Sequence, residues 1–169
     1  FLFFYYLSLT ILKRYLIFFN KKPPSISEAL KTGEGQKIEF KSGFPEDDLI
    51  RTITAFANTN DGTVFIGISD EGHIKGINNI RGIENIESPK GKDQFRTKVF
   101  TLIKNKIKPY ILVDVSFENY REFTVAKIFI PRGEKEFYCF DGIMYARNGN
   151  ADVKDQPDII LKSMRNYGF

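Results

Sequence analysis

The strongest hydrophobic pattern of the chain lies between residues 34 and 76, where three kinds of periodicity follow one another. Residues 38–41 (IEFK) alternate apolar and charged side chains, which is typical of a half-buried strand. Pro45 and the acids after it suit a helix N-terminus, and apolar residues then recur at helical spacing. The apolar, β-branched run 63–68 predicts a buried strand, and residues 70–72 (DEG) predict a hairpin turn after it.

The rest of the chain carries shorter patterns of the same kinds. Asn58 lies where turn-forming residues end the first helix, and it is predicted to cap that helix. Residues 93–108 predict a second amphipathic helix, apolar on one face and basic on the other. The other predicted elements are a short helix at 27–31, strands at 111–117 and 123–130, a hairpin of 137–140 with 144–147, and a closing helix at 157–167. This irregular order predicts an α+β fold, a mixed β-sheet flanked by helices.

The first 22 residues differ from the rest and predict a hydrophobic helix that precedes the domain. Residues 1–12 carry no charge, and the stretch to residue 22 contains four basic residues and no acid. Twelve apolar residues are too few to span a bilayer, so we expect the end of a membrane anchor that contacts the membrane through residues 1–19. The alternative is a helix packed on the domain or on a partner. Residues 23–27 are then a linker and residues 28–169 the domain, which would face the cytoplasm.

The composition excludes several kinds of site but does not identify one. The net charge of +4 equals the four cations of the first 22 residues, so the remaining chain is balanced and its pI of about 9.0 does not indicate a basic domain. One cysteine, Cys139, and one histidine, His73, exclude a disulfide within the chain and a zinc site of His and Cys ligands. Any metal would be held by oxygen atoms, which favours Mg²⁺ or Mn²⁺. No Walker A loop occurs, so we expect no ATP.

Three acids are the main candidates for a site. Glu39 lies in a predicted strand, Glu34 precedes it by five residues, and Asp70 ends the neighbouring predicted strand. Pairing of those strands would gather the three carboxylates at one end of the sheet, where they could hold a divalent cation together with a phosphate. The alternative is that Glu39 pairs with a neighbouring lysine on the surface and that Asp70 only shapes its turn.

The same stretch resembles the Schlafen-type AlbA domain, also described as a divergent AAA or DNA-binding domain. The resemblance covers roughly residues 28–165. A second, weaker match is the stretch 145–151 (YARNGNA) near the end of the chain. The matching residues of the first block are Glu34, IEFK at 38–41, AFANT at 55–59, Gly62, FIGI at 65–68, DEG at 70–72 and Gly76.

The resemblance implies a specific catalytic site. Vertebrate Schlafen endoribonucleases use two glutamates and an aspartate with a divalent metal, and the glutamates correspond to Glu34 and Glu39 at the same spacing. The aspartate corresponds to Asp70, with Ser69 as the competing position. The resemblance therefore implies metal ligands and catalytic residues at Glu34, Glu39 and Asp70. It also implies a homodimer, because eukaryotic members build their groove from two related lobes and this chain has one.

Basic side chains near this block and on the second helix are predicted to bind nucleic acid. Lys41 lies beside the acids, and the basic face of 93–108 would follow a phosphate backbone. Each has a structural alternative: a solvated strand residue, a solvated helix face, or a group that caps the sheet. The predicted nucleic-acid-binding residues are Lys41, Arg96, Lys98, Lys104 and Arg147.

We therefore expect a nucleic-acid-binding domain, and in its most concrete form a metal-dependent RNA endonuclease. Its substrates would be tRNA-like, and a membrane tether would suit a defence or stress system. Two alternatives remain open at this stage: a non-catalytic DNA- or RNA-binding regulatory module, and an oligomerising scaffold of a membrane complex.

Overall fold

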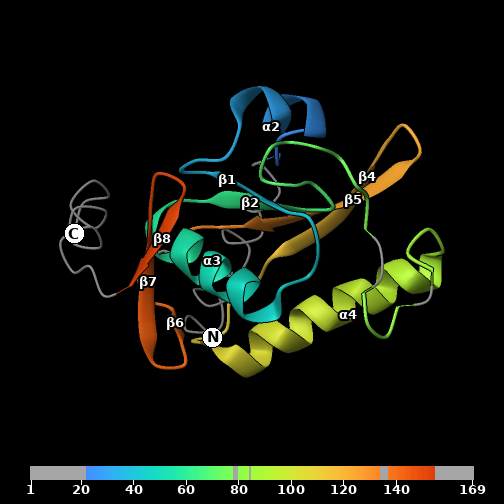
Figure 1. Ribbon diagram of the computed structural model, residues 1–169. Helices are drawn as coiled ribbons and strands as arrows, with labels where there is room; N and C mark the ends of the chain where they lie inside the picture. The colour runs from blue at the N-terminus through green and yellow to red at the C-terminus, as the bar shows by residue number, and fades with distance from the viewer. Residues whose placement is uncertain (1–21, 78–79, 84, 134–136, 155–169) are drawn as a thin grey trace, which may run out of the picture.

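The computed structural model describes residues 22–77, 80–83, 85–133 and 137–154, which form three helices and two four-stranded sheets (Figure 1). The fold is mixed α+β, as the sequence predicts. In chain order the elements are α2 (Ile26–Thr32), β1 (Ile38–Lys41), α3 (Glu46–Thr59), β2 (Gly62–Ile66), α4 (Pro89–Lys106), β3 (Ile107–Lys108), β4 (Asp114–Tyr120), β5 (Phe123–Ile130), β6 (Cys139–Phe140), β7 (Ile143–Asn148) and β8 (Ala151–Lys154).

The first sheet has the strand order β1-β2-β5-β4. Strand β1 runs parallel to β2, and the other pairs are antiparallel, so the sheet is mixed as predicted. All five residues of β2 are buried, which explains why this strand is read as a continuous apolar run. Strand β1 is an edge strand, so one side of its backbone is free to bond with side chains.

Helices cover both faces of the first sheet (Figure 1). Because side chains alternate along a strand, Val64 and Ile66 of β2 enter the larger core, under α3 and α4, whereas Phe65 enters the smaller core with residues of α2. The same alternation in β1 sends Ile38 and Phe40 toward α2. Glu39 and Lys41 therefore lie on the α3 face of the sheet.

The second sheet, β3-β6-β7-β8, is antiparallel and lies beside α3 (Figure 1). Asp141 and Gly142 form the turn of the predicted hairpin and join β6 to β7. The hydrophobic pattern does not predict strand β8, because its only apolar residues are Ala151 and Val153. Its pairing with β7 places Arg147 opposite Asp152.

Three predicted boundaries are corrected by the structure. Helix α4 begins at Pro89, four residues before the predicted start, because the Ser88 hydroxyl accepts a hydrogen bond from the Gly91 N–H and caps it. Strand β4 begins at Asp114, three residues later than predicted. Helix α3 continues through Asn58, so that residue is not the predicted cap.

Two predicted helices, the N-terminal hydrophobic helix and the closing helix at 157–167, lie outside the described residues. Helix α2 begins at Ile26, inside the predicted linker, and Ser25 caps it. Within the described ranges, no helix is both long enough and apolar enough to cross a membrane.

Candidate functional site

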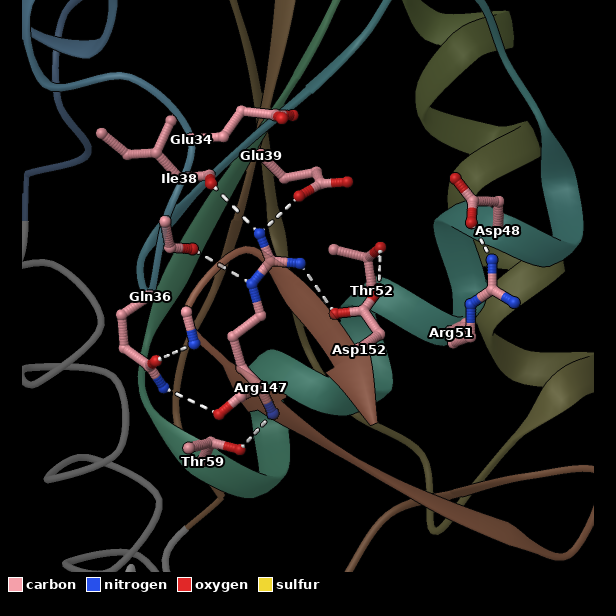
Figure 2. Close-up of polar contacts among 12 residues, drawn as sticks. Glu34, Gln36, Ile38, Glu39, Asp48, Arg51, Thr52, Thr59, Arg147 and Asp152 are labelled. Carbon is pink, nitrogen blue, oxygen red and sulfur yellow. Dashed lines mark hydrogen bonds and ion pairs between the residues drawn. The ribbon is translucent and has the colours of Figure 1, made fainter. Parts of the chain in front are cut away.

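Arg147 of β7 lies at the centre of the polar contacts between the two sheets (Figure 2). Its side chain is 1% exposed. Its Nε donates to the Gly35 carbonyl at 3.0 Å, and one terminal nitrogen donates to the Asp152 carboxylate at 2.8 Å. The other terminal nitrogen donates to the Glu39 carboxylate and, at 3.4 Å, to the Ile38 carbonyl. Burial alone would lower the pKa of Arg147, but Asp152 and Glu39 raise it, so the guanidinium stays charged.

Helix α3 holds this arginine from two positions (Figure 2). The Thr52 hydroxyl donates to the second oxygen of Asp152 at 2.6 Å. The Arg147 N–H donates to the Thr59 hydroxyl at 2.8 Å, near the end of the helix. Both threonines are buried, so these hydrogen bonds are shielded from water.

Lys41 engages the second oxygen of Glu39. This is the predicted pairing of Glu39 with a neighbouring lysine, but it is buried rather than on the surface, with Glu39 8% and Lys41 14% exposed at the side chain. Lys41 also pairs with Asp48 at 2.8 Å, and Asp48 pairs in turn with Arg51. Burial alone would raise the pKa of Asp48, but these two cations lower it overall. Opposite charges thus alternate from Arg147 to Arg51.

Glu34 folds back on the free edge of β1. Its Oε1 accepts a hydrogen bond from the Phe40 N–H at 2.8 Å. Burial raises the pKa of Glu34, and the charges of Glu39 and Asp70 raise it further against the opposing effects of Phe40 and Lys41. Glu39 and Asp70 are therefore close enough to act on Glu34, and Figure 2 shows the Glu34 and Glu39 carboxylates at the same end of the site.

Asp70 lies in the exposed turn after β2. Ser69, the competing position for the third acid, is buried. Its hydroxyl donates to Glu71 at 2.8 Å and accepts from the His73 N–H at 3.3 Å, so it serves the turn. Asp70 is therefore the accessible side chain of the two.

The donor set fits a divalent cation only in part. Both oxygens of Glu39 are engaged by cations, and within the described residues no three His, Cys, Asp or Glu side chains are arranged to hold a metal ion. Glu34 and Asp70 carry the hard oxygen donors that Mg²⁺ or Mn²⁺ prefers. Any cation that uses Glu39 has to compete with Lys41.

Apart from Lys41, which pairs with Glu39 and Asp48, the predicted nucleic-acid-binding residues divide into three groups. The burial of Arg147 argues against the predicted contact with a phosphate. Arg96 pairs with Asp93 at 2.8 Å, and Lys98 pairs with Glu46 at 2.8 Å, so both are partly neutralised. Lys104 is exposed on α4.

A groove of about 1030 Å³ runs along α4, bounded by the start of α3 and the loop at Arg81 and Gly82. Among the described residues, Arg81 and Lys90 have no ion-pair partner in this groove. The lining residues are Glu46, Arg81, Gly82, Lys90, Asp93, Gln94, Thr97, Lys98, Thr101, Leu102, Asn105 and Lys106.

Several residues that build the site are not singled out by sequence reasoning. Asn58, predicted as a cap, projects from α3 toward the second sheet and donates to the carbonyls of Tyr138 and Tyr145 at 2.8 and 2.9 Å. Thr52 and Asp152 are missed as well. The sequence does contain a signal for Thr52, which lies among the apolar residues of α3. A buried hydroxyl needs a hydrogen-bond partner, so a polar residue such as Asp152 can be expected nearby.

The sequence from residue 34 to residue 154 matches the family described as Schlafen, AlbA_2. This match covers most of the chain, including both sheets and the acidic cluster. The chain belongs to the Schlafen AlbA_2 family. No curated protein matches the chain.

Two solved structures are similar to this fold. The DIP2311 protein from Corynebacterium diphtheriae aligns with a TM-score of 0.57 at 20% identity. The alignment covers 79% of this chain but only 25% of that protein. The N-terminal domain of a RecG-related protein from Nitrosomonas europaea aligns with a TM-score of 0.44 at 15% identity, over 63% of this chain and 70% of that one. The first of these likenesses supports the fold alone.

Proposed function

We propose that this chain is a nucleic-acid-binding domain that, in its most concrete form, cleaves RNA with the help of a divalent cation. The observation that carries the proposal is the position of Glu34 on the edge of β1, the strand that contains Glu39, where burial and the charges of Glu39 and Asp70 raise the pKa of Glu34. A bound cation would relieve the charge repulsion that contributes to the raised pKa of Glu34. Membership of the Schlafen AlbA_2 family supports the same interpretation.

Glu34 and Asp70 would supply the first ligands of Mg²⁺ or Mn²⁺, with Glu39 as the third. When bound, the cation would polarise a phosphate and lower the pKa of a bound water. Lys41, half-buried beside Glu39, adds a positive charge where a phosphate would approach. Arg147 keeps Glu39 in place through a hydrogen-bonded ion pair.

The groove along α4 is the proposed path of the nucleic-acid backbone. Two exposed cations of its lining, Lys90 on the helix and Arg81 on the facing loop, carry no ion pair within the described part of the chain, so they are available to phosphates. Lys104 is exposed on the same helix, outside the groove lining. Arg96 and Lys98 can contribute only if their exposed ion pairs with Asp93 and Glu46 open, which costs little at a protein surface.

Binding is tested with labelled structured RNA, single-stranded DNA and double-stranded DNA over a range of salt concentrations. We expect affinity to fall linearly with salt on logarithmic axes and to fall several-fold further in the double variant Arg81→Glu/Lys90→Glu. Lys31→Glu is the matched control, because Lys31 is exposed on α2, on the other side of the first sheet. Equal affinity of all three proteins, or binding without salt dependence, would contradict this groove as the interface.

One observation favours a second candidate, a binding module without catalysis. Both oxygens of Glu39 are engaged by cations, so a metal ion would have to compete with Lys41 and Arg147 for this acid. Salt-dependent binding without cleavage in Mn²⁺ or Mg²⁺ would favour this candidate.

The proposal has three further parts. The domain prefers RNA, it forms a homodimer that completes the groove, and it lies in the cytoplasm, at a membrane that residues 1–19 contact. Light scattering across a concentration series tests the dimer. Flotation with anionic vesicles, with and without residues 1–19, tests the tether. A monomer at all concentrations, or equal flotation of both proteins, would remove the corresponding part.

A further inference from the structure

The hairpin formed by β7 and β8 contacts both segments that carry the candidate glutamates (Figure 2). One segment is the loop 33–37, which contains Glu34, and the other is β1, which contains Glu39. These contacts join residues that are more than 100 positions apart in the sequence.

Gln36 ties the loop to the hairpin through both ends of its side-chain amide. Its Nε2 donates to the Arg147 carbonyl at 2.9 Å, and its Oε1 accepts from the Gly149 N–H at 2.9 Å. The Arg147 side chain adds the hydrogen bond to the Gly35 carbonyl. Three hydrogen bonds therefore fix the residues directly after Glu34.

The same guanidinium holds Glu39 and the Ile38 carbonyl in β1. Asp152 and Thr52 fix the orientation of the guanidinium in turn. Because a guanidinium is planar and presents its donors at fixed angles, one arginine can set the loop and the strand relative to each other. A lysine, with its single ammonium group, could not hold these directions at once.

We propose that the β7–β8 hairpin is the positioning element of the site, in which Arg147, oriented by Asp152, and Gln36 fix Glu34 and Glu39 relative to each other. This inference rests on the proposed function for its catalytic consequence, but its structural part stands on contacts alone. Arg147, Asp152 and Gln36 act through the glutamates and are positioning residues, not catalytic ones. Displacement of a catalytic group by about 1 Å can cost about 100-fold in rate.

The first test compares two buried threonines of the same helix. Thr52→Val removes the hydroxyl that orients Asp152, whereas Thr54→Val removes a hydroxyl that donates only to the Ile50 carbonyl at 2.7 Å. The readout is hydrogen exchange of the Phe40 amide, which donates to Glu34. We expect exchange about tenfold faster in Thr52→Val and unchanged in Thr54→Val once the overall stabilities are matched with urea.

Gln36→Ala is the second variant, and it leaves the core intact because Gln36 is only half-buried. It is also expected to speed exchange at Phe40. In an RNA-cleavage assay, Thr52→Val and Gln36→Ala should lower kcat about tenfold or more with KM unchanged, whereas Thr54→Val should match the wild type.

Equal exchange at Phe40 in all four proteins, or a change in KM with kcat unchanged, would overturn the positioning role. If the wild type does not cleave RNA, the proposed function fails while the exchange experiment still decides the positioning of Glu34. The two failures are therefore distinguishable.

Discussion

Glu39 has two roles that a simple substitution cannot separate. It is a candidate ligand, and it is also the partner of the buried Arg147 and of Lys41. Removal of one member of a buried ion pair leaves the other charge uncompensated, which is far more costly than the net value of the pair. Removal of Glu39 therefore tests the fold as well as the site.

We predict that Glu39→Ala lowers the free energy of unfolding by about 3–5 kcal/mol, because Arg147 is then buried without its carboxylate. Glu39→Gln should cost less, since the amide oxygen still accepts a hydrogen bond from the guanidinium. Urea unfolding measures both. A stability of Glu39→Ala within about 0.5 kcal/mol of the wild type, as for an ordinary surface substitution, would show that this pair is not buried in solution.

Substitution of Glu34, unlike that of Glu39, should stabilise the protein at neutral pH. Its pKa in the folded protein lies above the ordinary value of 4.5, so ionisation of Glu34 opposes folding. The raised pKa of Glu34 contributes stability that is fully present below pH 4.5 and is lost as the pH rises through the folded-state pKa. Glu34→Gln is neutral at every pH and should therefore be more stable than the wild type at pH 7, with the advantage vanishing below about pH 4.5.

Thermal unfolding of the wild type and Glu34→Gln from pH 3 to pH 8 checks this sign. The opposite trend, an advantage only at low pH, would mean that Glu34 gains more from Phe40 and Lys41 than it loses by burial.

At the scale of elements, Asn58 joins α3 to the second sheet. Its side chain donates to two carbonyls and accepts from the Tyr138 N–H at 2.8 Å. We expect Asn58→Ala to destabilise the fold by about 3 kcal/mol, because three hydrogen bonds to backbone groups are lost in a buried place. Asn105→Ala, exposed on α4, is the matched control. A loss no larger than that of the control would show that the second sheet docks without this residue.

The predicted elements are confirmed where a local period defines them. Strand β1 alternates, α3 carries an apolar stripe, and β2 is a continuous apolar run, and each of these patterns lies within 14 residues. Strand β8 is missed because it has too few apolar residues for a period and is held mainly by its pairing with β7.

At the scale of the whole molecule, the sequence indicates which acids to examine but not how they are held. Glu34, Glu39 and Asp70 are close in sequence, and the fold brings Glu39 and Asp70 near enough to Glu34 to raise its pKa, in addition to the effect of burial. Arg147 reaches Glu39 across 108 positions, and no local pattern encodes that contact. Arg147 is buried because the second sheet packs on α3. The sequence does not show this packing, so it predicts that Arg147 binds phosphate.

The basic face of α4 shows the same limit. Helical spacing predicts one basic face, but Arg96 reaches the Val115 carbonyl of β4, whereas Lys98 and Lys106 pair with the acids at the start of α3. The charge of that face is thus a property of two elements together.

The most direct measurement is cleavage of a labelled structured RNA in Mn²⁺, Mg²⁺ or EDTA by the wild type and three variants. Glu34→Gln and Asp70→Asn each remove one candidate ligand without breaking a buried ion pair, and Glu71→Gln is the control from the same exposed turn. The account predicts cutting that requires the metal, is lost in the first two variants and remains in the third. Cutting that persists in EDTA or in Glu34→Gln, or no cutting by the wild type, would contradict it.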